Sequence, residues 1–204
     1  MLGNIRGRNG AALDRKGNKM FAKGFGKFAG DGDMLRCDVE GFTITAAIHH
    51  DSDSGAPWKE NDGHGPVSEW TSRGKSAGER VLISDRHCSR YYNFSEAVKI
   101  AKRDGWGVAG GKQEKETDAQ YATRAAEHDF SVIKAWCNDE WSWCGIVVTA
   151  SREGIELGTA SLWGIELNYP GSDNAYLLEV ANELLPEAIT AAKATLAELF
   201  KGSA

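Results

Sequence analysis

The stretch that decides the fold is EWSWCGIVVTASREGIELGTASLWGIELNYPGSDNAYLLEVANELL, which runs from Glu140 to Leu185. Two strand-like runs, 143–150 and 154–167, lie on either side of the polar segment Ser-Arg-Glu-Gly. Such a segment between two apolar runs is typical of a β-hairpin, because glycine readily adopts a positive φ. Tyr-Pro-Gly-Ser-Asp then ends the second strand and begins a long helix. The sequence therefore predicts a central hairpin at about 143–167.

The rest of the chain adds strands and helices on both sides of this hairpin. Alternation of apolar and polar residues predicts three further strands, at 35–39, 42–48 and 80–83. Apolar side chains at three- and four-residue steps predict helices at about 93–105, 114–138 and 173–201. Pro186 lies inside the last of these helices and should kink or break it. We therefore expect an α+β fold, with a largely antiparallel sheet packed by two or three helices.

The composition is that of an ordinary globular protein with one buried core: 204 residues, 41% hydrophobic and 26% charged. No apolar run approaches the roughly 18 residues that cross a bilayer, and the N-terminal residues lack the apolar segment of a secretory signal. The four cysteines are widely spaced and form no Cys-x-x-Cys pair. We therefore expect no membrane span, and reduced thiols in a cytoplasmic protein.

The net charge of −5 is unevenly distributed along the chain. Residues 1–28 carry seven basic side chains and one acidic one, a net of +6. Residues 29–204 carry 17 basic and 28 acidic side chains, a net of −11. Because an acidic body repels a phosphate backbone, we expect no binding to duplex nucleic acid.

Residues 1–33 contain eight glycines and show no sustained periodicity, so we expect an arm that is not part of the core. Its basic residues are interleaved with Phe21, Phe25 and Phe28. This composition suits docking on the acidic body of the same or a neighbouring subunit, which would make the protein an oligomer. It also suits binding to single-stranded nucleic acid by charge and stacking. The sequence thus predicts an arm at 1–33 and a single α+β domain at 34–204.

A group of potential metal ligands lies in and after a long polar segment at 49–76. Its members are His49, Asp51, His64, Asp85 and His87. Imidazole and carboxylate groups bind divalent metals and act as general bases, so this set is compatible with a metal-dependent hydrolase or nuclease. None of the spacings is diagnostic of a metal site. The alternative is a solvated polar loop that its tryptophans hold in place.

Three tryptophans in loop-like surroundings are candidate anchors of a protein interface, where tryptophan is enriched: Trp58, Trp70 and Trp106. Four acidic residues of the same region are expected to contribute to partner binding: Asp51, Asp53, Glu60 and Asp62. The chain contains no motif of a nucleophile or a phosphate-binding loop, so we assign no catalytic residue.

Four blocks of the sequence carry a resemblance: DGHGPVSEWTSRGKSAGERVLISDR, YNFSEAVKIAKRDGWG, KAWCNDEWSWCGIVVTASREG and LWGIELNYPGSDNAYLLEVANELLPEA. Together they resemble a family of small proteins encoded by bacteriophages and prophages, over roughly Met34 to Ala197. That family has no assigned reaction, so the resemblance implies a context and no catalytic residues. The context is an accessory protein in the cytoplasm of a bacterial host. Small phage accessory proteins commonly bind a host protein and disable or redirect it.

We therefore expect a binding protein rather than an enzyme, without a cofactor, which inhibits or modulates a host nucleic-acid-processing or defence system. A host partner with a basic, nucleic-acid-binding surface would complement the net charge of −11. Two alternatives stay open at this point. One is the metal-dependent hydrolase or nuclease described above, and the other is a structural or assembly protein of the virion.

Overall fold

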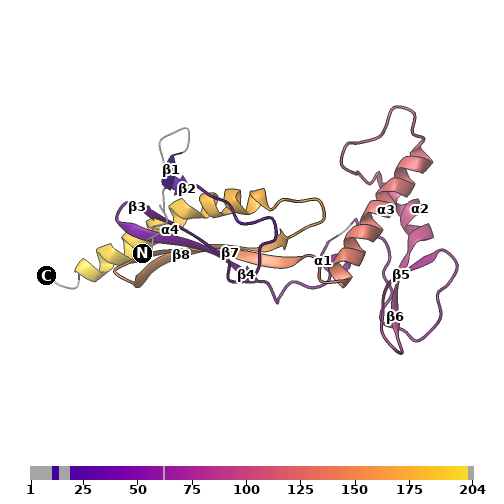
Figure 1. Ribbon diagram of the computed structural model, residues 1–204, viewed down its shortest axis with the longest axis horizontal. Helices are drawn as coiled ribbons and strands as arrows, with labels where there is room; N and C mark the ends of the chain where they lie inside the picture. The colour runs from indigo at the N-terminus through magenta and orange to yellow at the C-terminus, as the bar shows by residue number, and fades with distance from the viewer. Residues whose placement is uncertain (1–10, 14–18, 62, 202–204) are drawn as a thin grey trace, which may run out of the picture. The chain divides into compact units, whose positions relative to one another are not determined.

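The computed structural model of the chain describes residues 11–13, 19–61 and 63–201 (Figure 1). Asp62, one of the acidic residues expected at a partner interface, lies outside these ranges, as do most residues of the predicted arm before Lys19. Within the described ranges, no helix is long and apolar enough to cross a membrane.

The chain divides into two compact units. Unit 1 contains residues 1–52 and 142–204, and unit 2 contains residues 53–141. Unit 2 is therefore an insertion between two strands of unit 1. The sequence predicts one domain over 34–204, whereas the structure divides these residues into two units, each with hydrophobic clusters of its own.

Unit 1 is built on a four-stranded antiparallel sheet with the order β3-β4-β7-β8. Its strands are β3 (Met34–Val39), β4 (Phe42–His50), β7 (Ser142–Arg152) and β8 (Ile155–Leu167). The predicted central hairpin and the α+β class are both confirmed. Both hairpins turn at a Glu-Gly pair in which each residue has a positive φ, Glu40-Gly41 and Glu153-Gly154. This conformation matches the right-handed twist of the flanking strands.

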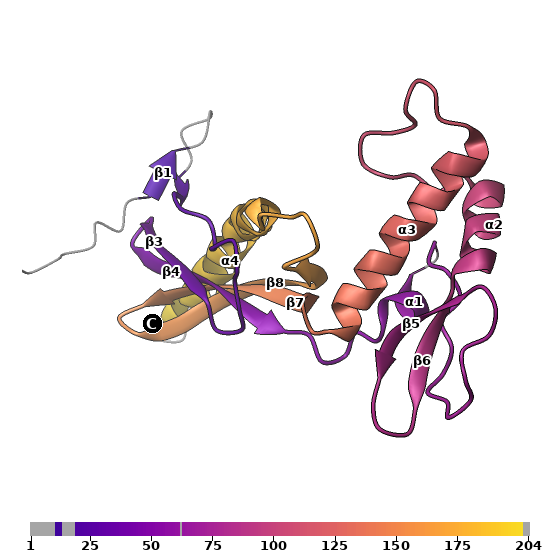
Figure 2. The ribbon, with the colours of Figure 1, turned by 45° about the vertical axis from the view of Figure 1, so that its right-hand side comes forward.

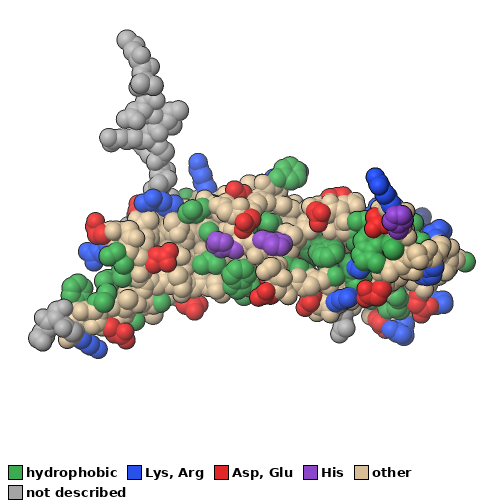
Figure 3. All heavy atoms as spheres, turned by 90° about the horizontal axis from the view of Figure 1, so that it is seen from below, with side chains coloured by type: hydrophobic (Ala, Val, Ile, Leu, Met, Phe, Trp, Pro, Cys, Tyr) green, Lys and Arg blue, Asp and Glu red, His purple; other side chains and the backbone are tan. Residues whose placement is uncertain are grey.

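Helix α4 (Ala175–Lys201) covers one face of this sheet (Figure 1), while the side chains of the opposite face stay partly exposed (Figure 3). The helix approaches β8 most closely at Gly158, where a Cβ would lie 2.3 Å from the backbone nitrogen of Ala192. The helix continues through Pro186, so the predicted break is absent. Pro186 is exposed, and water can therefore reach the carbonyl group that lacks its usual donor.

Part of the predicted arm belongs to the core of unit 1. Strands β1 (Ala11–Leu13) and β2 (Lys19–Phe21) form a small antiparallel sheet. Phe21 and Ala29 are buried in the core and Phe25 packs against it, whereas Phe28 is 84% exposed. The backbone N–H of Phe21 donates to Oδ1 of Asn182 on α4 (2.8 Å). The expectation that the arm lies outside the core is therefore wrong for these residues, because burial of one aromatic side chain outweighs its glycine-rich surroundings.

Unit 2 contains a β-hairpin and two main helices, which lie side by side (Figure 2). Its elements are α1 (Pro57–Glu60), β5 (Glu79–Ser84), β6 (Ser89–Asn93), α2 (Phe94–Asp104) and α3 (Asp118–Cys137). Asn93 caps α2 by accepting a hydrogen bond from the Glu96 backbone N–H, and Gly105 ends the helix in the left-handed region. Helix α3 begins later than predicted, because Thr117 and Gln120 form a capping box at its start.

Candidate functional site

Residues 64–71 of unit 2, which the sequence predicts as loop, run beside β6. Two isolated bridges pair this segment with the strand, Val67 with Tyr92 and Thr71 with Ser89. Its backbone therefore has defined hydrogen-bond partners, and the side chains that it carries are held against unit 2.

A buried carboxylate, that of Asp129 on α3, lies at the start of this segment and is only 7% exposed. Nδ1 of His64 lies 2.6 Å from Oδ1, and the Gly65 backbone N–H (2.8 Å) and the Tyr92 hydroxyl (2.5 Å) donate to Oδ2. A buried carboxylate is costly unless its oxygens are hydrogen-bonded. These three contacts satisfy Asp129 and tie the segment to the helix.

The same contacts define the chemistry of His64. Because Nδ1 faces a carboxylate it carries the proton, and Nε2 is the nitrogen with a free lone pair in the neutral ring. Within the described residues, Nε2 has no hydrogen-bond partner. Burial, followed by the charge of Asp129, raises the pKa of Tyr92, so its hydroxyl stays protonated as a donor. His64 thus holds the segment against Asp129 through Nδ1.

Close packing requires glycine at position 65. A Cβ there would lie 2.4 Å from the Tyr92 hydroxyl oxygen and 2.7 Å from Cβ of Ala97. Any larger residue would displace the Tyr92 ring or the segment itself. The hydrogen bond from the Gly65 backbone N–H to Asp129 therefore depends on the absence of a side chain at position 65.

The other end of the segment carries Trp70, which, like Trp58, makes a cation–π contact with the guanidinium group of Arg90. The Cζ atom of Arg90 lies 5.1 Å from the centre of the Trp58 ring and 5.6 Å from that of Trp70. The Trp58 ring also meets Trp136 edge to face, with 5.2 Å between the ring centres. Trp70 is 45% exposed. We call Trp58, Trp70 and Arg90 the Trp–Arg surface.

Arg90 is held by aromatic rings more than by carboxylates. Its side chain is 14% exposed, and its ion pair with Glu69 is long, at 3.7 Å. Its buried Nε has no hydrogen-bond partner within the described part of the chain. Cation–π contacts with two indoles are favourable, by about 0.5–2 kcal/mol each, and offset part of the desolvation cost.

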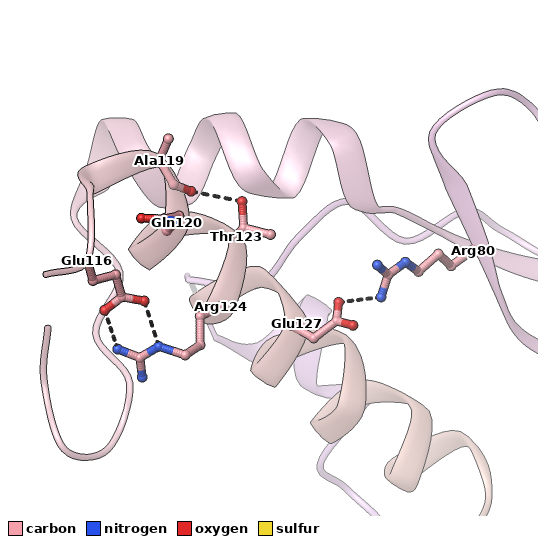
Figure 4. A pocket seen from close by; sticks show the side chains of 7 residues that line it. All are labelled: Arg80, Glu116, Ala119, Gln120, Thr123, Arg124 and Glu127. Atoms are coloured by element: carbon pink, nitrogen blue, oxygen red, sulfur yellow. Dashed lines mark hydrogen bonds and ion pairs between the residues drawn. The ribbon is translucent and has the colours of Figure 1, made fainter. Parts of the chain in front are cut away.

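A groove of about 590 Å³ follows the N-terminal half of α3 (Figure 4). The charged side chains that line it pair with one another: Arg124 with Glu116, at 2.7 and 2.8 Å, and Arg80 with Glu127. The hydrogen bonds from Arg124 lower the pKa of Glu116 to about 2. Because these four groups neutralise one another, the groove presents no net charge to a ligand.

The predicted metal ligands do not converge. The described residues contain no group of three or more His, Cys, Asp or Glu side chains that could hold a metal ion. The five-residue metal site is therefore wrong, because its members are engaged separately. Asp51 accepts a hydrogen bond from the Gly164 backbone N–H, and His49 lies beside the Trp163 ring. His64 contacts Asp129. Asp85 accepts hydrogen bonds from the backbone N–H groups of His87 and Cys88.

The predicted partner-binding residues are only partly brought together. Trp58 and Trp70 meet at Arg90. Trp106 packs, like Trp58, against the apolar cluster of unit 2, and it also packs against small side chains of α2 and α3. Glu60 accepts a hydrogen bond from a neighbouring backbone N–H (3.0 Å). Asp51 and Asp53 also make contacts within the chain.

Sequence reasoning missed Arg90, Tyr92 and Asp129. For Asp129 a signal was present, because this acidic residue interrupts the apolar stripe of α3 four positions before Ile133. A charged group on such a stripe needs a buried partner. For Arg90 and Tyr92 no local pattern was available, since their partners lie far away in the sequence.

Comparisons with protein-family models, curated proteins and solved structures found no match to this chain.

Proposed function

We propose that this chain acts by binding another protein and that the Trp–Arg surface of unit 2 anchors the interface. The observation that supports this proposal is the contact of Arg90 with two tryptophan rings, those of Trp58 and the half-exposed Trp70. Tryptophan and arginine are among the residue types most enriched at the energetic centres of protein interfaces.

The surface is also preorganised for binding. Trp70 is carried by the segment that Asp129 and β6 hold in place. Ordering side chains at an interface costs free energy, so a surface that is already ordered binds with a smaller entropic penalty.

The nature of the partner is inferred from charge. The part of 29–204 that belongs to unit 1 has four basic and 13 acidic residues, a net of −9, whereas unit 2 has 13 basic and 15 acidic ones, a net of −2. An acidic protein is steered toward a basic one. We infer a host protein with a basic, nucleic-acid-binding surface, in a nucleic-acid-processing or defence system. This partner agrees with the phage accessory role that the resemblance implies.

Affinity capture from bacterial lysate with the full chain, followed by titration of the captured partner, tests the proposal. Trp70→Ala should weaken binding about 30-fold, since truncation of a central anchor costs about 2 kcal/mol. Arg90→Lys should weaken it too, because lysine lacks the planar guanidinium group that contacts both rings. Trp163→Ala, at an exposed tryptophan of unit 1, is the matched control and should leave the affinity unchanged.

Two results would contradict the proposal. The first is an affinity that both unit 2 variants leave unchanged while circular dichroism shows them folded. The second is the absence of any stoichiometric partner across several host backgrounds.

A further inference from the structure

The face of the unit 1 sheet opposite α4 carries side chains that are partly exposed (Figure 3). Strand pairing places its side chains in rows that cross the sheet. The three rows nearest one end are Arg36–Thr45–Thr149–Thr159, Met34–Ala47–Val147–Ser161, and His49–Gly145 with Trp163. The face is therefore a mixture of small side chains and hydroxyl groups, with a large aromatic ring at one end.

Trp163 lies directly against Gly145, where a Cβ would come within 2.3 Å of its six-membered ring. The ring is 48% exposed, and the imidazole of His49 lies beside it, with 6.4 Å between ring centres. The pairing of β7 with β8 shifts register here, and Gly164 takes a φ of +72°. This irregularity places Trp163 on the open face while Ile165 returns to the core.

Four hydroxyl groups lie in the two rows next to the indole, those of Thr45, Thr149, Thr159 and Ser161. None of them has a hydrogen-bond partner among the residues that the structure describes. In the following row the hydroxyls are already engaged, since Thr43 donates to Asp38 and Ser151 donates to a backbone carbonyl. The free hydroxyls thus gather on the side of the face nearer Trp163.

The chemistry of this face restricts what it can bind. Residues 29–52 and 142–204, which form the four-stranded sheet and α4 of unit 1, carry a net charge of −9, which disfavours a polyanion. Arg36 shares a row with Thr45, Thr149 and Thr159, and Asp38 and Glu156 lie in the following row. The carboxylate of Asp51 lies close to Trp163, since it accepts a hydrogen bond from the Gly164 backbone N–H (3.0 Å). Serine is depleted in protein interfaces, and serine and threonine are under-represented among their energetic anchors. The composition therefore differs from that of the Trp–Arg surface and favours a neutral, hydroxyl-rich ligand.

We propose that this face binds a neutral glycan, with a sugar ring stacked on Trp163 and sugar hydroxyls bonded to the free threonine and serine hydroxyls. The face of an indole carries partial negative charge and attracts the C–H groups of a sugar ring. Hydroxyl groups both donate and accept, so they pair with sugar hydroxyls in either direction. This proposal is independent of the protein interface on unit 2.

Affinity electrophoresis and calorimetric titration of the full chain against β-glucan, α-glucan, chitin and mannan oligomers test the proposal. We expect at least one of these glycans to bind. Trp163→Leu, which still covers Gly145, should weaken that binding at least tenfold, and Trp163→Tyr should restore most of it. Thr149→Val, which removes one hydroxyl and keeps the shape, should weaken it about fivefold. Ile155→Ala, at an exposed apolar residue beside the hairpin turn, is the control.

The proposal is overturned if the folded wild-type chain binds none of the four glycans, or if Trp163→Leu binds as well as the wild type. It is also overturned if Trp163→Leu instead abolishes binding of a captured protein, because the face would then be a protein interface.

Discussion

The two units of this chain hold their structures together in different ways. Unit 1 depends mainly on long antiparallel strands whose inward side chains are almost all apolar, and it buries only two polar side chains among its described residues, Asp51 and Asn174. Unit 2 has a smaller apolar cluster and a buried carboxylate, Asp129, whose partners His64 and Tyr92 lie 65 and 37 positions away in the sequence. It follows that the unit whose fold is easiest to predict from the sequence is not the one that contains the proposed protein-binding surface.

The sharpest test of this difference is Asp129→Ala. The variant leaves the Gly65 N–H without its acceptor and the Tyr92 hydroxyl with only the distant Ala126 carbonyl (3.5 Å), so unit 2 should lose about 3–5 kcal/mol of stability. Hydrogen exchange measured by mass spectrometry reports each unit separately. Asp129→Asn, which keeps one acceptor oxygen, should lose less. Equal loss of protection in unit 1 would show that the two units do not differ in this way.

For unit 1 the corresponding test is a pair of phenylalanines. Phe21→Ala should cost about 3–4 kcal/mol because Phe21 is in the core, whereas Phe28→Ala should change stability by less than about 0.5 kcal/mol. Deleting residues 1–33 should destabilise unit 1 for the same reason. Urea denaturation checks all three variants. Equal effects of the two alanine substitutions would mean that the predicted arm is outside the core after all.

Substitution of one glycine in each unit compares how closely the two units are packed. In Gly158→Ala the new Cβ meets the backbone of α4, and in Gly65→Ala it meets the ring of Tyr92. We expect losses of about 1–3 kcal/mol, each confined to its own unit. Thermal unfolding followed by hydrogen exchange distinguishes them. Gly154→Ala, whose Cβ would meet no neighbour, isolates the cost of a positive φ alone.

The smallest expected effect is a dependence of unit 2 on pH. Hydrogen bonds from Arg73 and Arg124 lower the pKa values of Glu79 and Glu116 from 4.5 to about 2 in the folded chain. Their contribution to stability is therefore present above pH 4.5 and is lost as the pH falls toward 2. Unfolding measured between pH 5 and 2 should show a steeper loss in the wild type than in Glu79→Gln/Glu116→Gln. Parallel curves would mean that these pairs contribute nothing measurable.

Local signals explain why the hairpins of unit 1 could be predicted. Alternating side chains and the Glu-Gly turns act within a few residues, so the sequence alone contains the information. The five-residue strand β6 is mostly polar, and its pairing with the segment at 64–71 is a long-range event. Phe21 likewise gave no local signal, because its burial depends on α4 at the other end of the chain.

The candidate site was predicted to a smaller extent. Trp58 and Trp70 were expected at an interface, but nothing near Arg90 in the sequence shows that its guanidinium group contacts both of them. The predicted metal ligands were grouped by proximity in the sequence, which says nothing about direction. Asp85, for example, uses its carboxylate to accept hydrogen bonds from the backbone of its own turn.

The most direct test of the protein-binding proposal is hydrogen exchange of the full chain with and without its captured partner. The proposal predicts new protection at 64–71 and in β6, with little change in β7 and β8. Protection confined to unit 1, with 64–71 and β6 exchanging as they do in the free chain, would contradict it.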